Sequence, residues 1–203
     1  DRTALGIILD AEKNKLIEPN GICVEGTFGN TGIGLTLVNN ARGYKTVIVM
    51  PNITVPSKRD ILKNMGAELH LVDPKPYSDP GNYQKVSERL AKEIEKERGV
   101  KTFWAGQFEN TSNYKFHEQT TANEIYNQTN GNINGFTCAI GTGGTLTGVG
   151  IGLKSRDKNI KIACTDSQGS SMYNYFTSGN LEKKGDPSFT EGIGQARITK
   201  NLE

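Results

Sequence analysis

The sequence predicts an α/β fold with mostly parallel strands, and three observations lead to this class. Short apolar runs of strand length alternate strictly with longer runs that have the apolar period of a helix. Such alternation favours a parallel sheet with helices on both of its faces. The 24 glycines gather where a predicted strand runs into a predicted helix. With 203 residues, 34% of them apolar, the chain can bury a sizeable core.

The predicted elements of the first half are bounded by residues typical of helix and strand ends. Gly43 ends one helix and Pro51 ends one strand, while Ser57 and Gly66 are end signals for the next helix. The first helix begins without a cap or a methionine, as if the pattern were entered midway. The expected spans are helix 3–16, strand 22–24, helix 31–42, strand 46–50, helix 56–65, strand 68–72, helix 82–98 and strand 102–105.

The second half repeats the alternation after a polar loop that follows Gln107. The expected spans are helix 113–126, strand 136–140, a helix that ends near 153 and strand 160–164. Residues 166–203 show only short helical and loop signals. Ligands in parallel α/β folds sit at the carboxyl ends of strands, and both main glycine groups fall there.

Composition excludes several classes of function. A net charge of +2 with interspersed charges does not favour nucleic acid or an acidic membrane surface as a partner. No apolar run approaches the ~20 residues of a membrane span. Cys23, Cys138 and Cys164 each fall in a predicted strand without metal-ligand spacing, so we expect reduced core thiols and no metal site. His70 and His117 are expected to be structural, with His117 on a polar helix face.

The segment Gly141-Thr142-Gly143-Gly144-Thr145 joins a predicted strand to a predicted helix. Free amides and the dipole at a helix N-terminus attract a phosphate, glycines let the backbone close on it, and the threonine hydroxyls add donors. The segment lacks the lysine of a P-loop and the spacing of a dinucleotide fingerprint. It therefore predicts a phosphate-binding turn, with tight strand-helix packing as the alternative reason for the glycines.

A second turn, residues 25–32, brings Thr27, Asn30 and Thr31 together at another helix start. Hydrogen-bond donors in this position suit a carboxylate. Asn30 has an alternative reading as a helix N-cap. By itself this turn is only moderately specific.

The two turns, in this order, resemble those of the cysteine synthase and cystathionine β-synthase family. The likeness covers essentially the whole chain, and residues 167–171 and 198–202 look closest to the cysteine synthase branch. The segments that carry it are 24–35, Ala41-Arg42-Gly43-Tyr44, Val49-Met50-Pro51, 62–67, His117-Glu118-Gln119-Thr120-Thr121, 141–148 and Glu191-Gly192-Ile193-Gly194.

For the fold, the resemblance implies two three-layer α/β/α domains of the tryptophan synthase β-like type (fold type II), truncated at both ends. Residues 1–109 would form the N-terminal domain, with a mobile subdomain at about 45–90. Residues 110–203 would form an incomplete domain that binds the phosphate of pyridoxal 5'-phosphate, the family's cofactor.

For the site, the resemblance implies roles residue by residue. The substrate, through its carboxylate above all, would be bound by Thr27, Phe28, Gly29, Asn30, Thr31 and Gln107, and Gly192 would lie beside its amino group. Asn30 would also bond the ring oxygen of the cofactor. The phosphate would be held by Gly141, Thr142, Gly143, Gly144 and Thr145.

The lysine that binds the cofactor covalently and the serine that faces its pyridine nitrogen are expected outside this chain. Family members carry the cofactor lysine in a Ser-x-Lys-Asp-Arg motif, so the lysine would immediately precede Asp1, and a later serine would follow Glu203. The run from Ser57 to Asp60 superficially resembles the lysine motif, but Lys58 is expected to be a solvated surface residue.

The implied reaction is a pyridoxal-phosphate-dependent β-replacement, a transferase reaction that makes L-cysteine from O-acetyl-L-serine and sulfide. Three alternatives stay open: cystathionine β-synthase activity, a non-catalytic paralogue that binds the cofactor or a partner protein, and a plain nucleotide-binding α/β domain. The second arises because Phe28 stands where the family has a small residue. The resemblance also implies a cytoplasmic homodimer and a serine acetyltransferase partner, with an organellar location left open.

Overall fold

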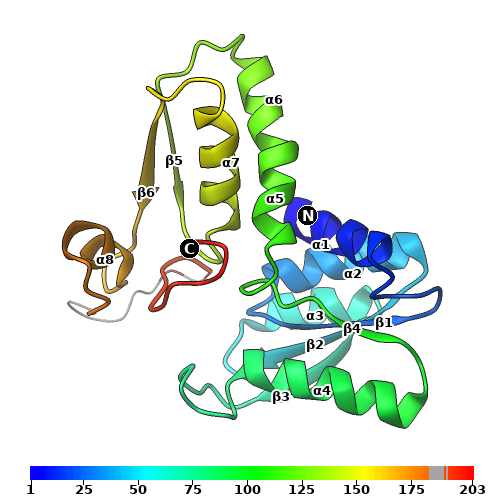
Figure 1. The fold of residues 1–203 in the computed structure, drawn as a ribbon. Coiled ribbons are helices and arrows are strands. Elements are labelled where there is room, and N and C mark those ends of the chain that lie inside the picture. The colour runs from blue at the N-terminus through cyan, green and yellow to red at the C-terminus, as the bar shows by residue number, and fades with distance from the viewer. Residues whose placement is uncertain (183–189, 191) are drawn as a thin grey trace. The chain divides into compact units, whose positions relative to one another are not determined.

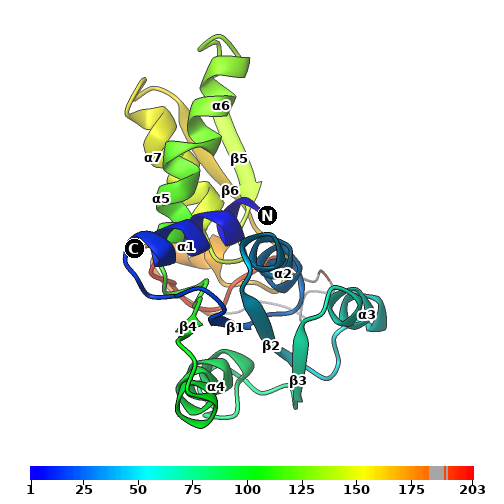
Figure 2. The same ribbon diagram turned by 90° about the vertical axis from the view of Figure 1, so that its right-hand side faces the viewer.

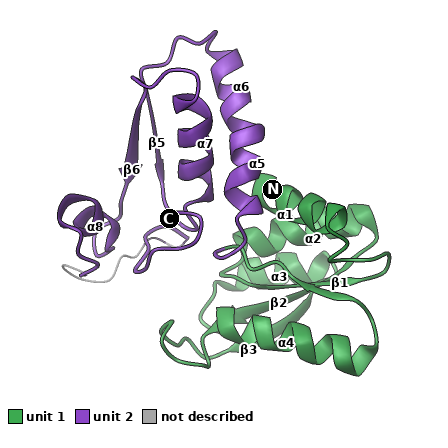
Figure 3. Ribbon diagram, in the orientation of Figure 1, with its two compact units in different colours: residues 1–107 green, residues 108–203 purple. Residues whose placement is uncertain are grey.

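The computed structural model describes residues 1–182, 190 and 192–203, so Glu191 of the 191–194 motif lies outside the described residues. The chain divides into two compact units, residues 1–107 and 108–203 (Figure 3). Each unit has its own sheet, and all strand pairs are parallel among the described residues. The α/β class with parallel sheets is therefore confirmed.

Unit 1 contains a four-stranded sheet in the order β3-β2-β1-β4. Its strands are β1 (Ile22–Gly26), β2 (Lys45–Pro51), β3 (Glu68–Val72) and β4 (Thr102–Trp104). The central strand β1 pairs with both neighbours, placing Val24 beside Val47 on one side and beside Trp104 on the other. All five residues of β1 are buried, as expected for a central parallel strand.

Helices cover both faces of this sheet (Figures 1 and 2). One face carries α1 (Arg2–Lys13), α2 (Asn30–Arg42) and α3 (Pro56–Asn64), and the other carries α4 (Tyr83–Arg98). Side chains of β1 alternate between the two cores. Val24 packs in the cluster that includes Ile94 of α4, whereas Cys23 packs in the cluster that includes Leu35 of α2.

Most predicted ends in unit 1 lie within one residue of the observed ends, but α1 ends three residues earlier and β1 ends two residues later than predicted. Gly43 caps α2 in the left-handed conformation, with φ 77°. The first helix ends at Lys13 and not at Leu16, because Lys15 also takes a left-handed φ of 55° and breaks the helix. Pro51 does not end β2 but belongs to it. Its missing amide does no harm there, because the next residue, Asn52, donates to the Val72 carbonyl (2.8 Å).

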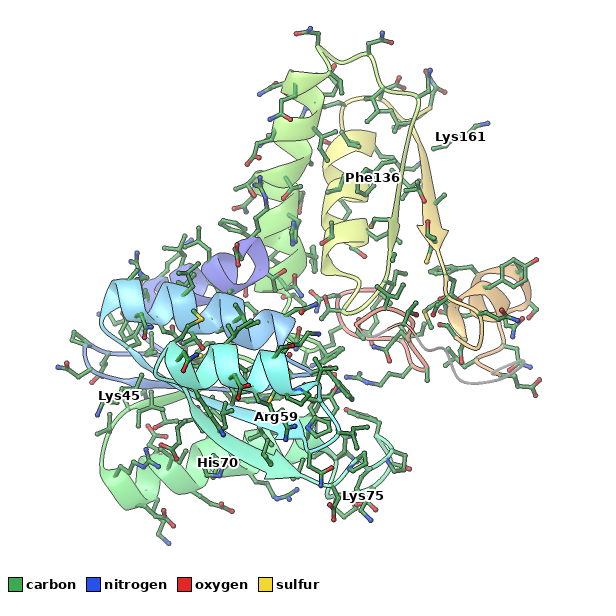
Figure 4. All side chains as sticks on the ribbon, turned by 180° about the vertical axis from the view of Figure 1, so that it is seen from behind. Lys45, Arg59, His70, Lys75, Phe136 and Lys161 are labelled. Atoms are coloured by element: carbon green, nitrogen blue, oxygen red, sulfur yellow. The ribbon has the colours of Figure 1, made fainter. Side chains whose placement is uncertain are left out.

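Unit 2 contains the parallel pair β5 (Gly135–Ala139) and β6 (Lys161–Thr165). Helix α7 (Gly144–Lys154) lies between these strands and the helices α5 (Ser112–Gln119) and α6 (Thr121–Gln128) (Figure 1). Phe136 of β5 packs against the core beneath α7, and Lys161 of β6 is exposed (Figure 4). A short helix, α8 (Met172–Ser178), follows β6.

The predicted single helix over 113–126 is two helical segments. The break is at Thr120, whose backbone has φ −117° and ψ −68°. Its hydroxyl donates to the Phe116 carbonyl four residues earlier (2.7 Å), which also accepts from the Thr120 amide (3.0 Å), and a side-chain bond of this kind often bends a helix. The apolar period continues across the break, which explains why the sequence pattern predicted one helix.

Helices α5 and α7 approach closely because α7 presents glycines one turn apart. A Cβ on Gly148 would overlap the Tyr114 carbonyl oxygen and come within 2.7 Å of His117 Cβ. A Cβ on Gly152 would overlap Ala122 Cβ at the start of α6. This contact fixes α5 beside the first turns of α7, where the glycine-rich turn lies.

Candidate functional site

The turn between β5 and α7 is enclosed so tightly that only glycine fits at several positions. Gly143, the N-cap of α7, has φ 88°, and a Cβ there would overlap Leu202. A Cβ on Gly144 would overlap the side-chain amide of Asn113. The predicted glycine turn is thus a closely packed loop at a helix start.

The carbonyl groups of this loop are bonded on one side, which determines where its amides point. The Gly141 carbonyl accepts from Gln195 Nε2 (3.0 Å), and the Thr142 carbonyl accepts from Thr199 Oγ1 (2.6 Å). In a planar trans peptide the N–H points away from the preceding C=O. The amides of Thr142 and Gly143 therefore point away from the 195–199 segment.

Hydroxyl groups complete the donor set. Thr142 Oγ1 accepts from Asn113 Nδ2 (2.9 Å) and from the Gly144 amide (3.3 Å), which leaves its own proton for a further acceptor. The amides of Thr145 and Leu146 have no acceptor within the helix, because they belong to its first turn. Several N–H donors and a hydroxyl at a helix start form a site for an anion.

Two residues that support this loop were missed as site residues in the sequence. Asn113 holds the Thr142 hydroxyl, and His117 Nε2 lies 3.3 Å from Thr145 Oγ1. His117 lies among polar side chains of its helix face as expected, but this face is buried and not in solvent. The residue is 5% exposed, and its Nδ1 contacts Thr121 Oγ1 (2.8 Å). A signal was available, because Asn113 and His117 are four residues apart and so share one face of a helix.

The segment 192–194 passes directly beside the loop. A Cβ on Gly141 would be 2.8 Å from the Gly192 carbonyl oxygen, and the Gly194 amide donates to Ile140 (2.8 Å). Gly192 itself has φ 83°. Unit 2 therefore brings together Gly192 and the five residues predicted for the phosphate turn.

Unit 2 also contains a cavity of about 860 Å³. Its lining includes Leu146 in the first turn of α7, Cys164 and Asp166 at the end of β6, and Tyr173 of α8. Burial raises the pKa of the Cys164 thiol to about 11, with the Asp166 carboxylate contributing in the same direction. The cavity is the size of a small-molecule site, and it borders the helix start that carries the anion loop.

The second predicted turn lies in unit 1, between β1 and α2. Gly29, the N-cap of α2, has φ 126°, and its amide donates to Thr27 Oγ1 (3.0 Å). The first helical bond runs from Ile33 to the Gly29 carbonyl (2.8 Å). The amides of Asn30, Thr31 and Gly32 consequently have no acceptor within the helix. This turn is a second anion-attracting helix start.

Gln107 reaches this turn from the loop that follows β4. The Thr31 hydroxyl donates to Gln107 Oε1 (2.5 Å), and Gln107 Nε2 donates to the Gly26 carbonyl (3.4 Å). Unit 1 therefore brings Gln107, 76 residues further along the chain, to the predicted carboxylate turn.

Phe28 and Lys58 flank the turn on two sides. The Phe28 ring is half-buried and packs edge-to-face on Tyr83 of α4, with ring centroids 5.2 Å apart. Lys58, expected to be a solvated surface residue, is only partly exposed to solvent. This side chain is half-buried, and its Cδ lies 2.7 Å from the position that a Gly29 Cβ would take. Lys58 thus places an aliphatic stem and a cation beside the turn.

Glu25 is the third residue of the site that the sequence did not single out. Its carboxyl is buried, with 2% of the residue exposed, and accepts a hydrogen bond from the Gln107 amide (3.3 Å). Burial raises the pKa of Glu25 to about 8, while hydrogen bonds from Gln107, Gly106 and Gly26 act in the opposite direction. The carboxyl is therefore protonated near neutral pH.

This burial predicts a pH-dependent stability. A carboxyl of ordinary pKa near 4.5 in the unfolded chain releases its proton before the folded one does. The stabilising contribution is complete below pH 4.5 and is lost as pH rises toward 8, at up to about 1.4 kcal/mol per pH unit. Urea unfolding between pH 5 and 8 measures this slope. Glu25→Gln should flatten it, and an equal slope in that variant would contradict the assignment.

Comparison with known proteins places these features in a family. Residues 1–202 match the family described as pyridoxal-phosphate dependent enzyme. The chain belongs to this family. Cysteine synthase 1 of Emericella nidulans is 43% identical over 205 residues, which cover 100% of this chain and 54% of that protein. The chain thus spans about half the length of the curated relatives it matches.

Solved structures of two enzymes share the fold of the chain. O-ureido-L-serine synthase superposes with a TM-score of 0.83 at 31% identity, over 100% of this chain and 60% of that chain. O-acetylserine sulfhydrylase isoform 3 from Entamoeba histolytica gives 0.80 at 32% identity, over 100% of this chain and 56% of that one. Within the residues the structure describes, no helix is long and apolar enough to cross a membrane.

The anion loop of unit 2 fits the phosphate of the family's cofactor, pyridoxal phosphate. The loop offers amides that point away from its bonded carbonyls and a Thr142 hydroxyl with a proton to give. A phosphate accepts several such bonds at once and is favoured by the dipole of α7. Because positions 141, 143 and 144 are glycines, the loop adds no side chain of its own at these three positions.

Proposed function

We propose that the protein forms L-cysteine from O-acetyl-L-serine and sulfide by β-replacement. The observation that carries this proposal is the β1–α2 turn with Gln107 beside it, in a chain 43% identical to a cysteine synthase. A turn with free helical amides and a hydroxyl-amide pair suits the carboxylate of an amino acid. Pyridoxal phosphate, when bound, supplies the electron sink for removal of the α-proton.

In this reaction the residues of the chain would bind and orient the substrate and the cofactor. The substrate carboxylate would be bound by Thr27, Asn30, Thr31 and Gln107, with Gly29 keeping the backbone open. This anchoring fixes the α-carbon and so lowers the entropic cost of the reaction. Asn30 is also proposed to bond the ring oxygen of the cofactor, and Gly192 to lie beside the substrate amino group.

The cofactor phosphate would be held by Gly141, Thr142, Gly143, Gly144 and Thr145. Asn113 and His117 would position the two threonine hydroxyls of this set, since each contacts one of them. For the whole protein we propose fold type II, a cytoplasmic homodimer and a serine acetyltransferase partner. These four proposals rest on the family resemblance alone.

The test supplies the cofactor-loaded protein with O-acetyl-L-serine and either sulfide or homocysteine. We expect the cofactor absorbance to change on addition of O-acetyl-L-serine and cysteine to form with sulfide. Cystathionine as the preferred product would favour the alternative synthase activity. An unchanged cofactor band would favour a non-catalytic binding protein.

A substitution at Phe28 tests whether the protein is a catalyst or a non-catalytic binding protein. Because its ring is anchored on Tyr83, Phe28→Ser should keep cysteine formation within about threefold while costing about 1 kcal/mol of stability from the lost aromatic pair. Steady-state kinetics and urea unfolding measure the two effects. Tyr83→Leu is the matched control, because it removes the same pair from the α4 side. A gain of tenfold or more in Phe28→Ser alone would show that the ring obstructs the reaction.

A further inference from the structure

Glu25 is a buried carboxyl at the carboxyl end of the central strand of unit 1. It is 2% exposed, and within the described part of the chain no cation forms an ion pair with it. Burying an acid without a counter-charge is costly unless the group is neutral and hydrogen-bonded. An apolar residue of the same size could be buried here without this cost. The presence of a carboxyl at position 25 therefore needs an explanation.

We propose that Glu25 is a positioning residue that holds Gln107 against Thr31 and so shapes the substrate carboxylate turn. This inference rests on the proposed function of that turn. Glu25 does not touch the substrate in this account. It acts through Gln107, which is the residue that links β4 to the start of α2.

The hydrogen bonds of Gln107 carry the argument. Its backbone amide donates to Glu25 Oε2 (3.3 Å), its Nε2 donates to the Gly26 carbonyl (3.4 Å), and its Oε1 accepts from Thr31 (2.5 Å). Gln107 is 5% exposed, so a lost partner is not replaced by bulk water. Removing the acceptor at Glu25 leaves a buried amide unpaired and frees the backbone that places the Gln107 side chain.

The charge state of Glu25 matters because the turn is expected to bind an anion. An ionised Glu25 would repel a carboxylate bound at the same strand end, and the weak screening of a buried site strengthens that repulsion. The raised pKa of Glu25, about 8, keeps the group neutral at physiological pH. The same value predicts that Glu25 ionises in mildly alkaline solution and then repels the bound carboxylate.

The groups that face Glu25 do not titrate in this range. Cys23 on the same strand has its pKa raised to about 12 by burial, and β2 opposes Glu25 with Ile48. The loop after β4 contributes the amides of Gly106 and Gln107. The helices on this face, α1 and α2, bury only uncharged side chains, which are Ala4, Gly6, Ile7, Ile8, Ala11, Gly32, Gly34, Leu35, Thr36 and Asn39.

The experiment measures binding of L-alanine, an amino acid without a β-leaving group, to the cofactor-loaded protein between pH 6.5 and 9.5. The variants are Glu25→Gln, which stays neutral and keeps the acceptor, and Glu25→Leu, which removes it. Thr46→Val is the control. It breaks a buried bond to Asn39 (2.9 Å) in the same sheet, outside the carboxylate turn.

At pH 7 we expect Glu25→Gln and Thr46→Val to bind L-alanine within about twofold of wild type, and Glu25→Leu to bind about tenfold more weakly, the loss expected for one buried hydrogen bond. Turnover of O-acetyl-L-serine at saturation should change less than KM in Glu25→Leu. Above pH 8 the wild type should weaken relative to Glu25→Gln, by fivefold or more at pH 9.5.

Three results would overturn the inference: wild-type affinity in Glu25→Leu, equal weakening in Glu25→Gln and Glu25→Leu at pH 7, or a wild-type to Glu25→Gln affinity ratio that is constant with pH. The last criterion applies even if Glu25→Leu does not fold. A protein that binds L-alanine with the expected pattern but makes no cysteine would disprove the proposed reaction while supporting the role of Glu25.

Discussion

Gly148→Ala is expected to destabilise unit 2 by about 3 kcal/mol, the upper part of the range for overpacked cores. The added methyl group would overlap the Tyr114 carbonyl oxygen, and it would also press on His117 Cβ at 2.7 Å. Neither neighbour can move freely, because both belong to α5, which is packed along α7. Separation of the two helices would also move Asn113 and His117 away from the anion loop.

Urea unfolding followed by circular dichroism measures this loss. Gly150→Ala is the matched control, two residues along the same helix. Its Cβ would meet Ile162 at 3.5 Å, an ordinary contact, so the better helix propensity of alanine should stabilise the protein by up to about 1 kcal/mol. Equal effects of the two substitutions would show that close packing of α5 on α7 is not what requires glycine at 148.

Gly143→Ala is expected to weaken pyridoxal phosphate binding by about 10- to 100-fold. The residue has φ 88° and no room for a methyl group beside Leu202, so the peptide must rotate. Rotation redirects amides of the loop, and a lost hydrogen bond to a charged group costs about 1.5–3 kcal/mol. Fluorescence titration of the apoprotein with the cofactor measures the change in affinity.

Gly179→Ala controls for backbone strain alone. Gly179 caps α8 with φ 73°, and a Cβ added there would have no neighbour within 4 Å. Only the left-handed conformation therefore penalises alanine, by about 1 kcal/mol. Cofactor affinity should stay unchanged in this variant. If Gly143→Ala binds pyridoxal phosphate as tightly as Gly179→Ala does, the loop does not hold the phosphate.

Local patterns were sufficient for the fold class and for the position of both glycine turns. Strand 68–72 was predicted to the residue, and Gly43 ends α2 as expected. These features depend on side-chain period and on backbone angles that only glycine adopts easily, and both are properties of a few consecutive residues. The parallel pairing followed from alternation, since parallel strands need long crossovers.

Local sequence patterns did not predict the contacts between segments that are distant in the chain. The apolar period of residues 113–126 does not register the break at Thr120, where the Thr120 hydroxyl also bonds the Phe116 carbonyl. Lys58 was expected in solvent, yet the packing of α3 lays its stem on Gly29. Each result depends on where a second element lies, and local propensity contains no such information.

The sequence by itself determined that two helix N-termini with glycine-containing turns follow parallel strands, because turn chemistry is local. Only the tertiary structure decided what surrounds each turn. It placed Asn113 and His117 behind one, and Glu25, Gln107 and Lys58 around the other. The physical reason is that burial and hydrogen bonding across 28 to 82 residues of chain are set by packing, not by neighbours in sequence.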